Sequence, residues 1–147
     1  MDNKRTKIKI LLVDDDEMMR IYFRDVFWVH GGDDKYDITI VSSLAEAESK
    51  ISDIETRPNT IFLDIMLPIK DGSNNPHDQM ERSLSFVKKL KENKDLSKIK
   101  IIIYSGQKEK SIENEFNKLG IDGYLIKGEL MPKEIIAFTD KIHESNN

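Results

Sequence analysis

The chain has 147 residues, of which 23 are lysine or arginine and 27 aspartate or glutamate; its formal net charge is −4, and it contains no cysteine. The length suits one domain with a single core, and the lack of cysteine excludes disulfides, thiolate nucleophiles and cysteine-ligated metals. The apolar runs are too short to span a bilayer, the first residues lack the apolar stretch of a signal peptide, and the mild acidity does not favour nucleic acid. We therefore expect a cytoplasmic protein with no direct contact with membranes or nucleic acid.

Five short apolar runs, rich in β-branched residues, recur along the chain. Most are continuous instead of alternating with polar residues, which is typical of parallel strands covered on both faces. The predicted strands span residues 8–13, 38–41, 60–63, 99–104 and 124–126.

Apolar residues at helical spacing follow each predicted strand. The alternation of strands and helices predicts one doubly wound α/β domain over residues 1–147, with a parallel sheet and helices on both faces. We place Trp28 and the Met18–Met19 pair in the core, and the histidines His30, His77 and His143 on the surface. The stripes that define the five helices are Met18, Tyr22 and Val26; Leu44, Ala47 and Ile51; Leu84, Val87 and Leu90; Ile112, Phe116 and Leu119; and Ile135, Thr139 and Ile142.

Polar residues end four of the five predicted strands. Asp14 and Asp15 follow the first strand, Asp64 the third, Ser105 the fourth and Lys127 the fifth. Ligands of open α/β sheets bind at the carboxyl edge, and a strand order of 2-1-3-4-5 makes the first and third strands neighbours there. Three converging carboxylates would repel one another, and Mg²⁺ prefers such oxygen ligands. The pattern therefore predicts a metal-assisted phosphoryl site with a carboxylate nucleophile.

Several sequence blocks closely resemble the receiver domain of two-component response regulators, in the stand-alone form of the chemotaxis regulators. The blocks are ILLVDDD at 10–16, IFLDIMLP at 61–68 with Asp-Gly at 71–72, IIIYSG at 101–106 and GYLIK at 123–127. Their order and spacing cover nearly the whole chain. The resemblance implies a flavodoxin-like fold with five parallel strands in the order 2-1-3-4-5 and five helices.

The resemblance also implies a role for each acidic residue of the cluster. Asp64 resembles the phosphoacceptor, which takes a phosphoryl group from a sensor histidine kinase or a histidine phosphotransfer protein. Asp14 and Asp15 resemble the pair that holds Mg²⁺, together with Asp64 and the backbone carbonyl of Met66. Such a protein catalyses only its own phosphorylation and dephosphorylation and acts on a downstream partner that the sequence does not identify.

Three further residues match the family's switch machinery. By resemblance, Lys127 pairs with the phosphoryl group, Ser105 binds a phosphoryl oxygen once Asp64 is modified, and Tyr124 is the aromatic switch that follows it. The added charge of about −1.5 to −2 suffices to bias a two-state surface.

The chain departs from the family pattern at two places. Gly128 follows Lys127 where the family usually has proline, and we expect a trans peptide bond there. Residues 73–82 form an apparent loop insertion before the third helix, and our hypothesis is that it modulates partner docking or access to Asp64.

Two alternative functions remain open at this point. The chain could be a receiver-like interaction module that is not phosphorylated, as the substitution at Gly128 and the insertion would allow. It could also be a Mg²⁺-dependent phosphohydrolase that uses Asp64 as nucleophile, although Met66 stands where dehalogenase-type phosphatases place an acid.

Overall fold

The computed structural model describes residues 6–31, 34–67 and 75–144. Within them, five parallel strands pair into one sheet in the order β2-β1-β3-β4-β5, which confirms the predicted flavodoxin-like fold and strand order. The strands are β1 (Ile8–Val13), β2 (Tyr36–Val41), β3 (Thr60–Leu63), β4 (Lys100–Ser105) and β5 (Gly123–Ile126).

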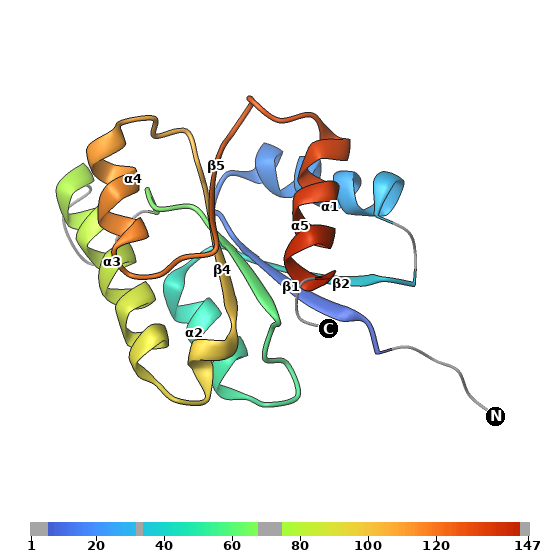
Figure 1. Ribbon diagram of the computed structural model, residues 1–147, viewed down its shortest axis with the longest axis horizontal. Helices are drawn as coiled ribbons and strands as arrows, with labels where there is room; N and C mark the ends of the chain where they lie inside the picture. The colour runs from blue at the N-terminus through green and yellow to red at the C-terminus, as the bar shows by residue number, and fades with distance from the viewer. Residues whose placement is uncertain (1–5, 32–33, 68–74, 145–147) are drawn as a thin grey trace.

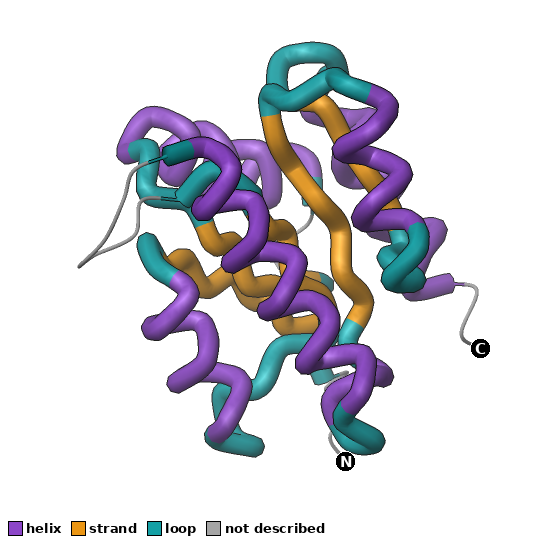
Figure 2. Tube along the Cα trace, turned by 90° about the vertical axis from the view of Figure 1, so that its left-hand side faces the viewer, coloured by secondary structure: helices purple, strands orange, loops and turns teal. Residues whose placement is uncertain are grey.

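Helices cover both faces of the sheet. Helices α1 and α5 lie on one face, and α2, α3 and α4 lie on the other (Figure 1); a view turned by 90° shows the strands running between these two layers (Figure 2). No helix in the described part of the chain has the length and apolar character needed to cross a membrane. The helices are α1 (Glu17–His30), α2 (Leu44–Ser52), α3 (Pro76–Glu92), α4 (Lys110–Asn117) and α5 (Pro132–Glu144), with a short 3₁₀ helix η1 (Leu96–Lys98) before β4.

The core consists of two clusters, one on each face of the sheet. Because side chains alternate along a strand, Ile10 and Leu12 of β1 pack under α1 and α5, while Leu11 and Val13 pack under α2, α3 and α4. All four are at most 1% exposed. This two-sided burial is the reason why the strands are continuous apolar runs in the sequence.

Helix α3 begins earlier than the predicted loop at 73–82 allows. Residues 76–82 form its first turns, so the expectation of a loop over them is wrong, while residues 73 and 74 lie outside the described residues. The reason is a strong helix start: Asn75 accepts a hydrogen bond from the backbone N–H of His77 at 2.8 Å, and Pro76 occupies the first turn. Whether this segment is an insertion stays a prediction.

Helix α1 does not place all its apolar residues in the core. Phe23, Val26 and Phe27 are buried, but Trp28 and Met18 are 74% and 73% exposed, so the prediction that these two are core residues is wrong. The periodicity misled because the apolar residues continue beyond the buried stripe onto the exposed side of the helix.

Candidate functional site

The ends of β1 and β3 place two carboxylates side by side. The strands pair in register up to Val13 and Leu63, and the next residue of β3 continues the ladder, because the N–H of Asp64 donates to the carbonyl of Val13 at 3.0 Å. Asp14 leaves β1 at the same level, with its N–H bonded to Val41 of β2. The predicted convergence at the carboxyl edge of the sheet therefore exists.

Three acidic side chains form one cluster at this edge. One carboxylate oxygen from each of Asp14, Asp15 and Asp64 lies within 4.8 Å of the other two. Asp14 is fully buried and Asp64 is 7% exposed, whereas Asp15 is exposed to solvent. The cluster thus has a buried floor and an open side.

Lys127 closes the cluster from the end of β5. Its Nζ lies 2.7 Å from Oδ2 of Asp14 and 3.3 Å from Oδ2 of Asp64. Its backbone N–H donates to the carbonyl of Ser105 at 2.9 Å, which fixes the end of β5 to the end of β4. The ammonium group also lies 6.0 Å from the centre of the buried ring of Tyr104.

Burial and charge shift the pKa values of the reactive pair. Burial raises the pKa of Asp64, while Lys127 and the N–H of Met66, which donates to Oδ1 at 3.1 Å, act against this shift. Burial alone would lower the pKa of Lys127, but its contacts with Asp14 and Asp64 outweigh burial and raise it. Lys127 is therefore held as an ammonium ion between two carboxylates.

The residues present suit a hard divalent cation. Oδ2 of Asp14 is buried and receives no hydrogen bond of normal geometry from the described residues; its contact with Lys127 is one of charge. A buried carboxylate oxygen without a hydrogen bond is costly, and an oxygen-rich cluster open on one side is what Mg²⁺ takes, since it keeps several waters. Asp14, Asp15 and Asp64 could hold this ion.

A chain of hydrogen bonds connects Ser105 to Tyr124. Ser105 is fully buried, and its Oγ accepts a hydrogen bond from the N–H of Gln107 at 3.2 Å. The carbonyl of the same Gln107 accepts a hydrogen bond from the hydroxyl of Tyr124 at 2.8 Å. Burial is also the main cause that raises the pKa of Tyr124 to about 12, so its hydroxyl keeps its proton.

The loop after β5 contains a glycine in a left-handed backbone conformation. Gly128 has a φ of +85°, in the left-handed region that favours glycine. The described residues contain no cis peptide bond, so the expected trans bond between Lys127 and Gly128 is confirmed.

Two contributors to the site could not be read from the sequence. The backbone of Gln107 connects Ser105 to Tyr124, and the ring of Tyr104 packs near the ammonium of Lys127. Their roles could not be read because Gln107 acts through its main chain and Tyr104, although part of the block at 101–106, is one buried strand residue among several.

Comparison with known proteins agrees with this geometry. The family model described as "Response regulator receiver domain" matches residues 10–139. The chain belongs to this family. No curated protein matches this receiver at a significant level.

Solved structures share the receiver fold at low sequence identity. The phosphorylated cyanobacterial phytochrome response regulator RcpA has a TM-score of 0.75 at 18% identity, over 97% of each chain. A CheY-like receiver domain protein from Methanospirillum hungatei JF-1 has a TM-score of 0.71 at 20% identity, over 96% of this chain and 98% of that chain. The receiver domain of the sensor histidine kinase PA1611 from Pseudomonas aeruginosa PAO1, solved with magnesium coordinated in its active site cleft, has a TM-score of 0.68 at 18% identity, over 92% of this chain and 97% of that chain.

Proposed function

We propose that this receiver domain is a cytoplasmic, phosphorylation-dependent signalling switch with Asp64 as its phosphoacceptor. The observation that carries the proposal is the position of Asp64: a nearly buried carboxylate beside two further carboxylates and the ammonium of Lys127. A donor phosphohistidine on a sensor kinase or phosphotransfer protein fits this site, because phosphorus would meet an oxygen nucleophile and a cation together.

The transfer step exchanges one bond for another. A carboxylate oxygen of Asp64 attacks phosphorus, the O–P bond forms as the N–P bond of the phosphohistidine breaks, and the electron pair of that bond returns to the imidazole. The N–H of Met66 orients one Asp64 oxygen, and Lys127 stands beside the other to offset charge on the incoming phosphoryl oxygens. Bound Mg²⁺ would supply further charge neutralisation at the same oxygens.

Ser105, Gln107 and Tyr124 provide a route from the modified aspartate to the surface. Once Ser105 moves to donate its hydroxyl to a phosphoryl oxygen, the hydrogen bond that its Oγ accepts from the N–H of Gln107 changes, and the carbonyl of Gln107 is also the acceptor for Tyr124. The switch would then alter the surface near α4 and β5 on which a downstream partner docks.

The exposed apolar face of α1 is suited to a protein phosphodonor. Met18, Ile21, Tyr22, Trp28 and Val29 are all exposed on this helix, and their spacing of three, four and seven places them on one face. Asp16, the N-cap of this helix, directly follows the acidic pair, so this face begins beside the acceptor site. A helix of the donor that packs here would bring its phosphohistidine towards Asp64.

The test is direct phosphorylation by a small donor. The full chain is incubated with Mg²⁺ and acetyl phosphate, and its intact mass is measured. We expect the gain of one phosphoryl group in the natural protein and none in Asp64→Asn. Asp37→Asn is the matched control, because Asp37 is an exposed aspartate at the far end of the adjacent β2 and should leave the gain unchanged.

Other outcomes distinguish the alternatives. No gain with acetyl phosphate or with a histidine kinase of the same organism would contradict the proposal and favour an interaction module that is not phosphorylated. Steady hydrolysis of phosphate esters at enzyme-like rates would instead support a phosphohydrolase. Beryllofluoride, which mimics an aspartyl phosphate, should bind the natural protein and not Asp64→Asn.

A further inference from the structure

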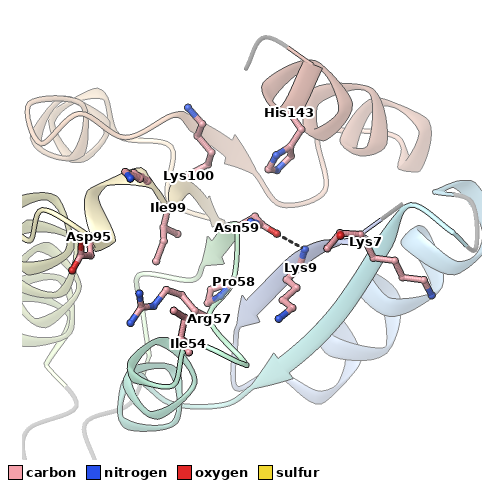
Figure 3. A pocket seen from close by; sticks show the side chains of 12 residues that line it. Lys7, Lys9, Ile54, Arg57, Pro58, Asn59, Asp95, Ile99, Lys100 and His143 are labelled. Atoms are coloured by element: carbon pink, nitrogen blue, oxygen red, sulfur yellow. Dashed lines mark hydrogen bonds between the residues drawn. The ribbon is translucent and has the colours of Figure 1, made fainter. Parts of the chain in front are cut away.

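An open cavity lies at the edge of the sheet opposite the carboxylate cluster, where the strands begin. It has a volume of about 400 Å³, within the range of small-molecule sites. Figure 3 shows it between the starts of β1 and β4, the loop before β3, the segment around η1 and the last turn of α5. It shares no residue with the phosphorylation site. The residues that line it are Thr6, Lys7, Lys9, Ile54, Arg57, Pro58, Asn59, Asp95, Lys98, Ile99, Lys100 and His143.

The cavity is strongly cationic although the whole chain is acidic. Five of its lining residues are lysine or arginine and one is an acid, Asp95, in a chain whose net charge is −4. Within the described residues, none of the five cations forms an ion pair; the lysines that do are elsewhere in the chain. Like charges gathered around one space repel each other, so an anion placed there would be attracted by several of them together.

Helix ends explain only part of this concentration of charge. Lysine and histidine near the carboxyl end of a helix offset its partial negative charge, which accounts for Lys98 in η1 and His143 in α5. Lys9 and Lys100, however, lie in strands, and Lys7 precedes β1. Helix ends therefore do not account for the lysines at the strand starts.

One wall of the cavity is apolar. Pro58 and Ile99 are buried along it, and Ile54 lies at its edge with 73% of its surface exposed (Figure 3). An exposed isoleucine beside a cationic cavity is a feature that inorganic phosphate alone would not use. A ligand with both an anionic group and a flat apolar part would contact both surfaces.

We propose that this cavity binds a nucleotide, with its phosphates held by Lys98, Lys100 and Arg57 and its base against the exposed Ile54. Arg57 is already fixed for this task, since its Nε donates to the carbonyl of Ile51 at 2.8 Å and leaves its terminal nitrogens available. The ammonium of Lys9, in contrast, already donates to the carbonyl of Glu55 at 2.6 Å, so we assign it no contact with the phosphates. Binding here adds a second input to the switch, independent of phosphorylation.

The titration of His143 can show whether an anion occupies the cavity. Contrary to the expectation of a surface residue, it is half-buried and its Nε2 contacts the hydroxyl of the buried Thr60. Burial, and then the charge of Lys100, lowers the pKa of His143. An anion beside Lys100 would offset that charge and move the histidine titration to higher pH. The other charged groups that act on this ring are Asp140, Lys35 and Asp122.

The experiment titrates the full chain with ADP in Mg²⁺-free buffer. Affinity is measured by calorimetry, and the His143 ring protons are followed by NMR over a pH series with and without ADP. We expect binding, a His143 titration midpoint at higher pH when ADP is present, and unchanged binding in Asp64→Asn. The test variant Lys98→Gln/Lys100→Gln should weaken binding at least tenfold. The control Lys118→Gln/Lys133→Gln removes two exposed charges elsewhere and should leave binding unchanged.

Four results would overturn the proposal. The first is no binding of ADP, and the second is equal weakening in both double variants, which would indicate attraction to net charge alone. The third is inorganic phosphate that binds as tightly as ADP, which would exclude a role for the apolar wall. The fourth is a His143 titration that does not respond. Circular dichroism of each variant verifies the fold, and because Asp64→Asn retains the cavity, failure here is separate from failure of phosphorylation.

Discussion

At the scale of single residues, Lys127 and His143 show how burial determines the chemistry of an ionisable group. Lys127 is surrounded by two carboxylates that compensate its burial, whereas His143 is half-buried with a lysine among its neighbours and takes the neutral form more readily. Lys127 therefore acts as a cation, whereas His143 acts as a neutral ring.

Loss of Lys127 should destabilise the metal-free protein. In Lys127→Ala the buried Asp14 carboxylate loses its cation, and breaking a buried pair costs about 3 kcal/mol. Urea unfolding of metal-free protein measures this cost, and Mg²⁺ should recover part of it, because the ion would neutralise the same oxygens. Lys133→Ala, an exposed lysine on α5, should unfold like the natural protein. An equally stable Lys127→Ala would contradict the buried pair.

The stability contributed by His143 should depend on pH. Its pKa is lowered in the folded chain from an ordinary value of 6.5, so the unfolded chain binds the proton more readily. Protein stability should therefore fall as pH drops from above 6.5 towards the lower folded pKa. Urea unfolding at about pH 7.5 and about pH 5.5 should show a smaller loss for His143→Gln than for the natural protein. The exposed His77→Gln should lose as much as the natural protein; identical losses in all three would refute this role.

At the scale of elements, the sequence predicts strands and site residues better than it predicts exposed faces and helix starts. Continuous apolar runs identify all five strands, with differences of one or two residues at the ends. Ile99, for example, was predicted to begin the fourth strand but is the C-cap of η1, because its N–H donates to the carbonyl of Leu96. The start of α3 depends on the N-cap residue Asn75. Because Asn75 lies among other polar residues, the sequence pattern does not identify it as a helix cap. The exposed apolar face of α1 was not predicted, because apolar spacing does not distinguish residues of the core from residues of a docking surface.

Two substitutions five residues apart on α1 should have very different effects on the free energy of unfolding. Phe23 is fully buried and its ring contacts Phe27, Phe62 and Tyr104, so Phe23→Ala should cost about 3–5 kcal/mol. Trp28→Ala removes an exposed side chain and should change the free energy of unfolding by no more than about 0.5 kcal/mol. Denaturant unfolding followed by circular dichroism compares them. A large loss in Trp28→Ala would show that this ring packs against the domain.

At the scale of the whole molecule, the two edges of the sheet have opposite character. The carboxyl edge gathers acids that are far apart in sequence, and its convergence follows from strand order alone once Asp14 and Asp64 are seen to end β1 and β3. The cationic cavity at the other edge could not be predicted, because its members come from loops and strand starts with no shared motif. That Arg57 and His143 line one cavity depends on packing that the sequence pattern does not specify.

Magnesium should stabilise the whole domain through the acidic edge. A ligand that binds only the folded state at ten times its dissociation constant adds about 1.4 kcal/mol, which thermal unfolding at increasing Mg²⁺ would show as a rising midpoint. Asp15→Asn should reduce the effect while leaving the fold intact, because this member of the cluster is exposed. Asp37→Asn should respond like the natural protein. An equal rise in all three would mean that Mg²⁺ acts elsewhere.

The backbone at Gly128 sets a limit on protein engineering. Consensus design would install at this position the proline that response regulators usually have, and a β-carbon there would meet no atom within 4 Å. Space is not the obstacle: proline fixes φ near −65°, and this residue has a φ of +85°. The change would force the loop to turn the other way and displace the neighbouring Lys127. A substitution that family statistics recommend as stabilising would here disturb the contacts of Lys127 with Asp14 and Asp64.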